Sequence, residues 1–150
     1  MGFELGTDGP IALVVGVDGS ETSLRAAAYA AGLARRQRTR LVIVYVRKQP
    51  AALVSIGDQS GIAVREVLAA QDEVERQLAE ALRTQTRLWR IDAHLVVRAG
   101  DPLTVLSDVA KEVRADAVIV GSSTSMGHRI AGSLAVRLVR LARWPVTVVP

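Results

Sequence analysis

The chain has 150 residues, of which 49% are hydrophobic and 23% charged, and none is cysteine. This length and balance are typical of one globular domain, because disordered chains combine few apolar residues with a high net charge. We therefore expect one domain over residues 1–150, with residues 1–10 as a flexible leader. The lack of cysteine excludes disulfides, iron–sulfur clusters, thiolate zinc sites and cysteine nucleophiles.

The positive charge is concentrated in one part of the chain. The formal net charge is +4, and residues 121–150 contain four arginines but no Asp or Glu. The whole excess therefore lies in the last thirty residues, and such a bias attracts phosphates, acidic partners or nucleic acid. Aromatic residues make up only 3% of the chain, which argues against a stacking platform for single-stranded nucleic acid.

Targeting signals are not evident. No segment approaches the run of about 18 apolar residues that a membrane-spanning helix needs. The stretch from Met1 to Pro10 carries Glu4 and Asp8 and no basic residue, whereas a signal peptide begins with basic residues. Together with the lack of cysteine, this predicts a cytoplasmic protein without a membrane partner.

The first half of the chain alternates strand and helix patterns. A buried strand is predicted at Ile11–Val17, a helix at Ser20–Gln37 and a second buried strand at Leu41–Val46. A longer connection, Arg47–Ile62, leads to a helix at Ala63–Thr86. The residues expected to face the core are Leu24, Ala27, Ala28, Ala31 and Ala34 in the first helix and Val64, Val67, Leu68, Val74, Leu78 and Leu82 in the second.

The second half continues the alternation. The stretch Ile91–Arg98 alternates only in part, so we expect this strand near an edge of the sheet. A helix follows at Asp101–Arg114, then a buried strand at Ala117–Val120, a helix at Ser133–Arg143 and a last strand at Val146–Val149. Asp101 is expected as the N-cap with Pro102 at the first helical position, and the buried residues as Leu103, Leu106, Val109 or Ala110, and Val113.

This order predicts an α/β fold with a parallel sheet and helices on both faces. Ligands of such sheets bind outside the carboxyl ends of the strands, where the strand order reverses. Asp18 follows the first strand, so its carboxylate either accepts hydrogen bonds from a ligand or closes its own turn. The sequence Gly100-Asp101-Pro102 is interpreted first as a helix start.

The stretch from Gly121 to Ser133 holds three glycines and five hydroxyl residues between a strand and a helix. It predicts either an anion site at the helix N-terminus or an ordinary loop with a serine cap. A P-loop is disfavoured because the lysine is missing. His128 and Arg129 in this stretch either contact phosphate or face solvent. The arginines at 137, 140 and 143 favour a solvated helix face over nucleic-acid binding.

Four segments, taken together, resemble the universal stress protein (UspA-like) family, and the closing segment looks most like actinobacterial members. They are Ile11–Ser20 (IALVVGVDGS), Gly100-Asp101-Pro102, Ala115–Ser122 (ADAVIVGS) and the closing Gly132–Val149. The resemblance covers nearly the whole chain in the right order. It implies a three-layer, Rossmann-like fold of the adenine nucleotide alpha hydrolase type, with a five-stranded parallel sheet and four helices.

The resemblance also implies a ligand and a partner. The ligand is ATP or another adenine nucleotide, with or without magnesium, and the partner is a second copy paired through Val146–Val149. In the family, an aspartate meets the nucleoside (here Asp18), backbone at the second strand meets adenine (here Val46), and the motif G-x2-G-x9-G-(S/T) holds ribose and phosphates. The residues expected to bind the nucleotide are Val17, Asp18, Val46, Gly100, Gly121, Ser122, Gly127, Gly132, Ser133 and Leu134.

This sequence departs from that motif. Gly121 and Gly132-Ser133 match its ends, but Thr124 stands at the second glycine position, and seven residues rather than nine separate it from Gly132. A shorter loop with a Cβ at the point of close approach would shrink or re-aim a phosphate cradle. Gly127 is a candidate substitute, although no registration restores both spacings.

Three functional hypotheses follow. The first is a small dimeric stress-response protein regulated by an adenine nucleotide. The second is a nucleotide-independent member of the family that acts through contacts with another protein. The third is an enzyme, either a slow ATPase or a Ser/His/Asp hydrolase; no general base, phosphate-binding lysine or G-x-S-x-G elbow is identifiable, so we expect no enzyme and no catalytic or metal-ligating residue.

Overall fold

A computed structural model describes residues 11–49, 61–122 and 134–150. Its five strands form one parallel sheet in the order β3-β2-β1-β4-β5. The strands are β1 (Ala12–Val17), β2 (Arg40–Arg47), β3 (Ala93–Ala99), β4 (Ala117–Gly121) and β5 (Val146–Val149). The predicted fold is confirmed, and so is the edge position of the strand that was expected there, β3.

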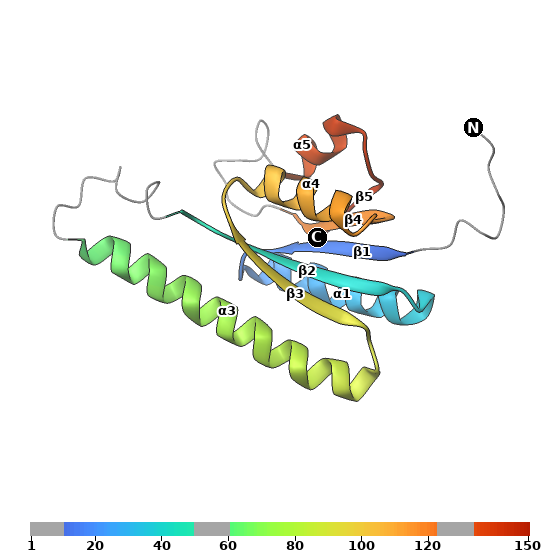
Figure 1. The fold of residues 1–150 in the computed structure, drawn as a ribbon, viewed down its shortest axis with the longest axis horizontal. Coiled ribbons are helices and arrows are strands. Elements are labelled where there is room, and N and C mark those ends of the chain that lie inside the picture. The colour runs from blue at the N-terminus through green and yellow to red at the C-terminus, as the bar shows by residue number, and fades with distance from the viewer. Residues whose placement is uncertain (1–10, 50–60, 123–133) are drawn as a thin grey trace.

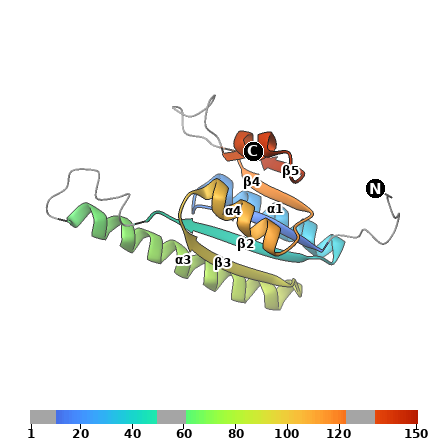
Figure 2. The same ribbon diagram turned by 45° about the horizontal axis from the view of Figure 1, so that its top comes forward.

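Two helical layers cover the sheet. Helices α1 (Glu21–Gln37) and α3 (Ile62–Trp89) lie on one face, and α4 (Pro102–Glu112) and α5 (Leu134–Leu141) lie on the other (Figures 1 and 2). The three-layer arrangement follows from strands that are apolar on both faces, since each face must be covered. No helix in the described ranges is long and apolar enough to cross a membrane.

The sheet separates two buried clusters. Val14, Val42, Val44, Val118 and Val120 face α4 and α5, where they meet Leu106, Val109 and Leu138. Leu13, Val15, Leu41 and Ile119 face α1. The opposite parity of the two sets in β1 is the alternation expected of a strand buried on both sides.

The predicted inward face of α1 is wrong in part. The helix buries Ala26, Ala30 and Ala34, whereas Leu24 is 46% exposed and Ala28 is also exposed. In an alanine-rich helix two neighbouring faces carry the same small side chains, and tertiary packing selects the one that lets the helix approach the sheet closely. Ser20 caps this helix as predicted, with its Oγ accepting the amide of Ser23 at 3.3 Å.

The other helices follow their predicted patterns more closely. The six apolar residues predicted along α3 are all half-buried, and Gln71 is the buried residue of this helix. Asp101 caps α4 by accepting the amide of Thr104 at 3.0 Å, with Pro102 in the first turn. α4 buries Val105 in addition to Leu106, Val109 and Ala110. Ser133 and the leader, residues 1–10, lie outside the described residues.

Candidate functional site

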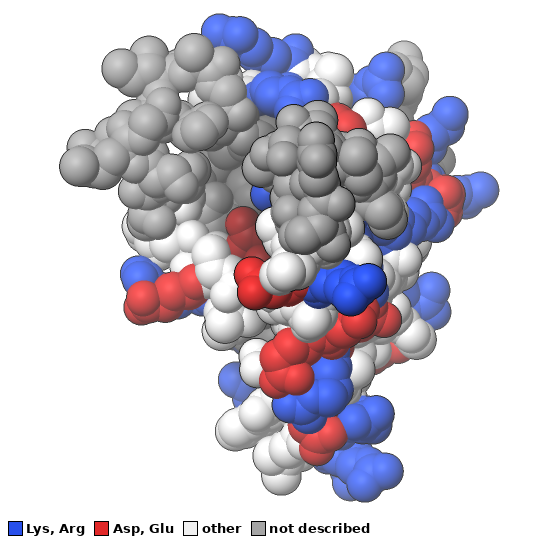
Figure 3. Space-filling view, turned by 90° about the vertical axis from the view of Figure 1, so that its left-hand side faces the viewer, with Lys and Arg blue, Asp and Glu red and all other residues white. Residues whose placement is uncertain are grey.

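The strand order reverses between β1 and β4. The chain moves from β1 through β2 to β3 in one direction and from β4 to β5 in the other. In open parallel sheets, the crevice beyond the carboxyl ends at such a reversal is the usual ligand site. Asp18 directly follows β1 and Ser122 directly follows β4, so both residues flank this point. Figure 3 views the molecule from the side of the strands' carboxyl ends, and acidic and basic side chains lie side by side on the lower part of this face.

Asp18 is held by the turn that enters α1. Its Oδ1 accepts the amide of Ser20 at 2.9 Å, and its own amide donates to Oγ of Ser23 at 3.2 Å. Ser23 Oγ in turn donates to the carbonyl of Ser20 at 2.9 Å. The turn-closing interpretation of Asp18 is therefore confirmed. This hydrogen bond uses only part of the acceptor capacity of the carboxylate. A carboxylate has about four lone-pair sites, so Asp18 can also accept a hydrogen bond from a ligand hydroxyl or amine.

The charge of Asp18 is set by its surroundings. Partial burial raises the pKa of this carboxyl, but hydrogen bonds from the side chain and backbone of Ser20, and from Ser23, outweigh the burial and hold the pKa below its ordinary value. Asp18 is therefore ionised near neutral pH and acts as an acceptor only. Such a group suits ribose hydroxyls or an exocyclic amine better than it suits an anion.

Gly121 brings the end of β4 against the first turn of α1. A Cβ at this position would lie 2.6 Å from the carbonyl carbon and oxygen of Thr22 and 2.8 Å from the nitrogen of Ser23. No side chain fits there, so the packing by itself requires a glycine at this position. The consequence is that the ends of β1 and β4 and the N-terminal turn of α1 form one closely packed corner.

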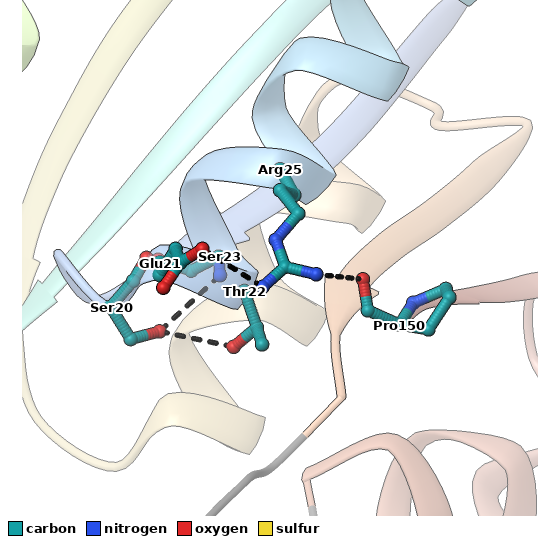
Figure 4. Close-up of polar contacts among 6 residues, drawn as sticks. All are labelled: Ser20, Glu21, Thr22, Ser23, Arg25 and Pro150. Carbon is teal, nitrogen blue, oxygen red and sulfur yellow. Dashed lines mark hydrogen bonds and ion pairs between the residues drawn. The ribbon is translucent and has the colours of Figure 1, made fainter.

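A second set of contacts ties this corner to the last strand. Figure 4 shows the first turn of α1, in which Ser20 Oγ lies 3.3 Å from Thr22 Oγ1. Arg25 bonds Glu21 at 3.0 Å and donates to the carbonyl of Pro150 at 3.3 Å. The amide of Ser122 also donates to Val149 at 2.7 Å.

Sequence reasoning missed an ionic cluster at the end of β2. Arg47 pairs with Asp72 at 2.6 Å and with Glu75 at 2.9 Å, both on α3. The amide of Lys48 donates to Oε1 of Gln71 at 2.6 Å. The available signal was Asp72 and Glu75 three residues apart on one helix face, but their partner is distant in sequence. The cluster fixes α3 against the sheet beside the candidate site.

The buried Tyr45 interacts electrostatically with this cluster and with Asp18. Burial raises the pKa of its phenol; Arg47 lowers it, and the negative charges of Glu75, Asp18 and Asp72 raise it further. Tyr45 is therefore neutral near neutral pH.

The predicted nucleotide-binding residues within the described ranges occupy four different elements. Val17 is 4% exposed and belongs to the core, and Val46 is half-buried against the cluster under α4. Gly100, with φ of +144°, donates its amide to the carbonyl of Arg47 at 3.1 Å and so joins the ends of β3 and β2. Leu134 is the first residue of α5 and packs on the same cluster as Val46. Gly127, Gly132 and Ser133 lie outside the described residues, as do Thr124, His128 and Arg129.

A parallel sheet with its polar carboxyl edge at the strand reversal defines a doubly wound, Rossmann-like α/β protein. The chain belongs to the universal stress protein family, whose model matches residues 12–150. A universal stress protein of Methanocaldococcus jannaschii is 24% identical over 139 residues, which are 91% of this chain and 80% of that protein.

Solved structures agree with this assignment. A universal stress family protein from Burkholderia pseudomallei superposes with a TM-score of 0.71 at 25% identity, over 93% of this chain and 95% of that one. Two related structures hold adenine nucleotides. A universal stress protein in complex with cAMP has a TM-score of 0.63 at 24% identity, over 95% and 98% of the two chains. A family protein from Arabidopsis thaliana with AMP bound has a TM-score of 0.65 at 18% identity, over 93% and 91%.

Proposed function

We propose that this universal stress protein binds an adenine nucleotide at the carboxyl ends of β1, β2 and β4, and that binding regulates it. The observation that carries the proposal is the ionised carboxylate of Asp18 at the strand reversal, held by the turn into α1. Related structures that hold cAMP and AMP support adenine as the base.

The chemistry of the described residues fits a nucleoside. Asp18 would accept hydrogen bonds from ribose hydroxyls, which would replace water at this exposed carboxylate with charge-assisted hydrogen bonds. The backbone of Val46 would meet the adenine edge, and the half-buried apolar surface around it suits an aromatic base. Ser122 and the glycine-containing segment that follows it would meet ribose and phosphate.

The altered spacing between Thr124 and Gly132 bears on the phosphate chain. A shorter segment can surround fewer phosphates, so we propose that AMP or cyclic AMP binds more tightly than ATP. Nothing in this scheme requires turnover: the residues bind and orient the ligand, and we propose a regulatory binding protein rather than an enzyme.

The test is calorimetric titration of nucleotide-free protein with AMP, cyclic AMP and ATP. Asp18→Ala should weaken binding about tenfold or more, the usual consequence of removing a charged hydrogen-bond acceptor. Asp108→Ala is the matched control, since Asp108 is an exposed carboxylate on α4. Equal affinities for the parent and the Asp18 variant would show that the assigned site is wrong.

A second candidate function rests on the same departure from the motif. If the protein shows no affinity for any of the three nucleotides at millimolar concentration, it acts through contacts with another protein.

We propose in either case a homodimer paired through β5, because this strand lies at the sheet edge and Val148 is 45% exposed. Sedimentation of the parent and of Val148→Lys would test the pairing, which the charged variant should abolish.

Two further assignments belong to this proposal. The closing segment, Gly132–Val149, supports a place among actinobacterial members of the family, which a phylogeny of full-length relatives would test. The lack of cysteine supports a cytoplasmic location. Fractionation of the source cells would test that location.

A further inference from the structure

A groove lies between α1 and α3, on the sheet face opposite α4 and α5, with a volume of about 490 Å³. Its floor consists of Leu41 and Ile43 of β2 and Ala93 of β3. Leu78 and Leu82 form the wall on the α3 side. The lining is mostly apolar along this part, and the volume lies within the range of about 300–1,000 Å³ that is usual for small-molecule sites.

The groove exists because α1 presents small side chains to α3. The helix buries Ala26, Ala30 and Ala34 against the sheet, and the middle of its adjacent face carries small residues, with Leu24 and Arg35 at the two ends. That face is lined by Ala27, Ala28, Ala31 and Gly32. Leu78 and Leu82 of α3 face these small residues and remain half-buried.

One end of the groove is polar and cationic. Arg35 lies over the ring of Trp89, with its guanidinium carbon 5.3 Å from the ring centre. The indole nitrogen of Trp89 donates to Oε1 of Gln85 at 2.8 Å, and all three residues line the groove. A guanidinium, an indole ring and a side-chain amide therefore surround the end at the C-termini of α1 and α3.

The positive charge at this end exceeds what local acids neutralise. Arg36 places a terminal nitrogen 3.1 Å from the position a Cβ of Gly32 would take, so it lies over the groove wall. Arg35, Arg36, Arg38, Arg87 and Arg90 have no carboxylate partner among the residues that the structure describes. The helix dipoles favour cations at these C-termini, but they do not accept the hydrogen bonds that the guanidinium groups can donate.

We propose that this groove binds a medium-chain fatty carboxylate, one molecule per chain. Its alkyl chain would lie along Ala28, Ala31 and Leu82, and its carboxylate would meet the Arg35 guanidinium, with Arg36 adding charge. Each buried methylene removes apolar surface from water, and arginine binds a carboxylate through two parallel hydrogen bonds. An apolar trough with cations at one end only is complementary to an amphiphile with one anionic head. The cationic end of the groove, at the last turn of α1, lies at the opposite end of this helix from the turn that holds Asp18.

The direct test is calorimetric titration of the full chain with dodecanoate below its micelle concentration. We expect one molecule bound per chain. Dodecanol, which is neutral and has the same chain length, should bind at least about tenfold more weakly. The chain has two tryptophans, so Trp144→Phe leaves Trp89 as the sole tryptophan reporter, and its fluorescence should change on binding. A lack of heat and of fluorescence change with dodecanoate would overturn the proposal, as would equal affinity for dodecanol.

Variants separate the groove from general surface binding. Ala28→Trp fills the trough and should reduce dodecanoate affinity about tenfold or more, with Ala31→Leu as a second filling variant. Arg35→Gln should lower the affinity for dodecanoate to that for dodecanol and leave the affinity for dodecanol unchanged. Arg140→Gln, an exposed arginine on α5, is the matched control and should bind like the parent. Parent-like affinity in both filling variants, with unchanged circular dichroism, would overturn the assignment.

Other occupants of the groove give different outcomes. Binding to anionic phosphatidylglycerol vesicles without binding of monomeric dodecanoate would indicate a membrane surface and overturn the proposal. Self-association that Ala28→Trp abolishes would indicate a second copy in the groove, with the same consequence. Adding AMP should leave dodecanoate affinity within about twofold, which keeps this test independent of the proposed nucleotide site.

Discussion

Substitution of Gly121 by alanine provides the most direct test of the corner that holds the candidate site. The added Cβ would lie 2.6 Å from the carbonyl carbon and oxygen of Thr22 and 2.8 Å from the nitrogen of Ser23. Ordinary carbon contacts begin near 3.5 Å, so the end of β4 and the first turn of α1 must separate by roughly 1 Å. The neighbours are backbone atoms, which cannot rotate away as a side chain can.

We expect Gly121→Ala to reduce the free energy of unfolding by about 1–3 kcal/mol, the usual cost of overpacking a closely packed interior. Urea denaturation followed by circular dichroism would measure it, and the midpoint of thermal unfolding should fall by about 2–4 °C per kcal/mol. The matched control is Gly32→Ala. Its Cβ would meet only the flexible end of Arg36, at 3.1 Å, and alanine is favoured over glycine in a helix by about 0.5–1 kcal/mol.

The two substitutions are chemically identical and should have opposite signs. If Gly121→Ala is as stable as the parent within about 0.5 kcal/mol, the close approach does not exist in solution. If it also loses nucleotide binding, Gly121 serves the ligand and not the packing. If stability falls and the variant, still folded at low temperature, binds nucleotide normally, the packing role stands alone.

Three further predictions concern stability. Leu138→Ala removes a fully buried side chain of α5 and should cost about 2–5 kcal/mol in urea unfolding, whereas a cost below 1 kcal/mol would contradict the packing. Asp101→Ala removes the cap on the amide of Thr104 and should cost about 0.5–2 kcal/mol, with Asp101→Asn nearly neutral. The pKa of Asp18 is depressed in the folded state, so its stabilising contribution is present above its ordinary value of 3.8 and is lost as pH falls through the folded value. The difference in unfolding free energy between the parent and Asp18→Asn should therefore be largest near neutral pH and shrink below pH 3.8, and a difference independent of pH would contradict the hydrogen bonds from Ser20.

Four of the strands were predictable because their residues are apolar on both faces and the breaks between them are sharp, and β3 was predictable from its partial alternation. The cap at Ser20 was predictable for the same local reason, since it depends on residues within one turn. The inward face of α1 was not predictable, because Ala26 and Ala27 begin stripes of equal character and only the sheet distinguishes them. The contacts of Arg47 with α3 were also beyond the sequence, since they join residues 25 and 28 positions apart.

Helix α1 links the two ends of the molecule, and this limits how either site can change. The backbone of its first turn packs closely against Gly121, and its alanine face packs against β1 and β4. Its last turn carries Arg35 over Trp89 at the groove. Because α1 is packed at its first turn and along its buried face, we expect the groove to persist in the protein without ligand. Gly121→Ala would release the first of these constraints, and a change in dodecanoate affinity in that variant would show that α1 transmits the displacement along its length.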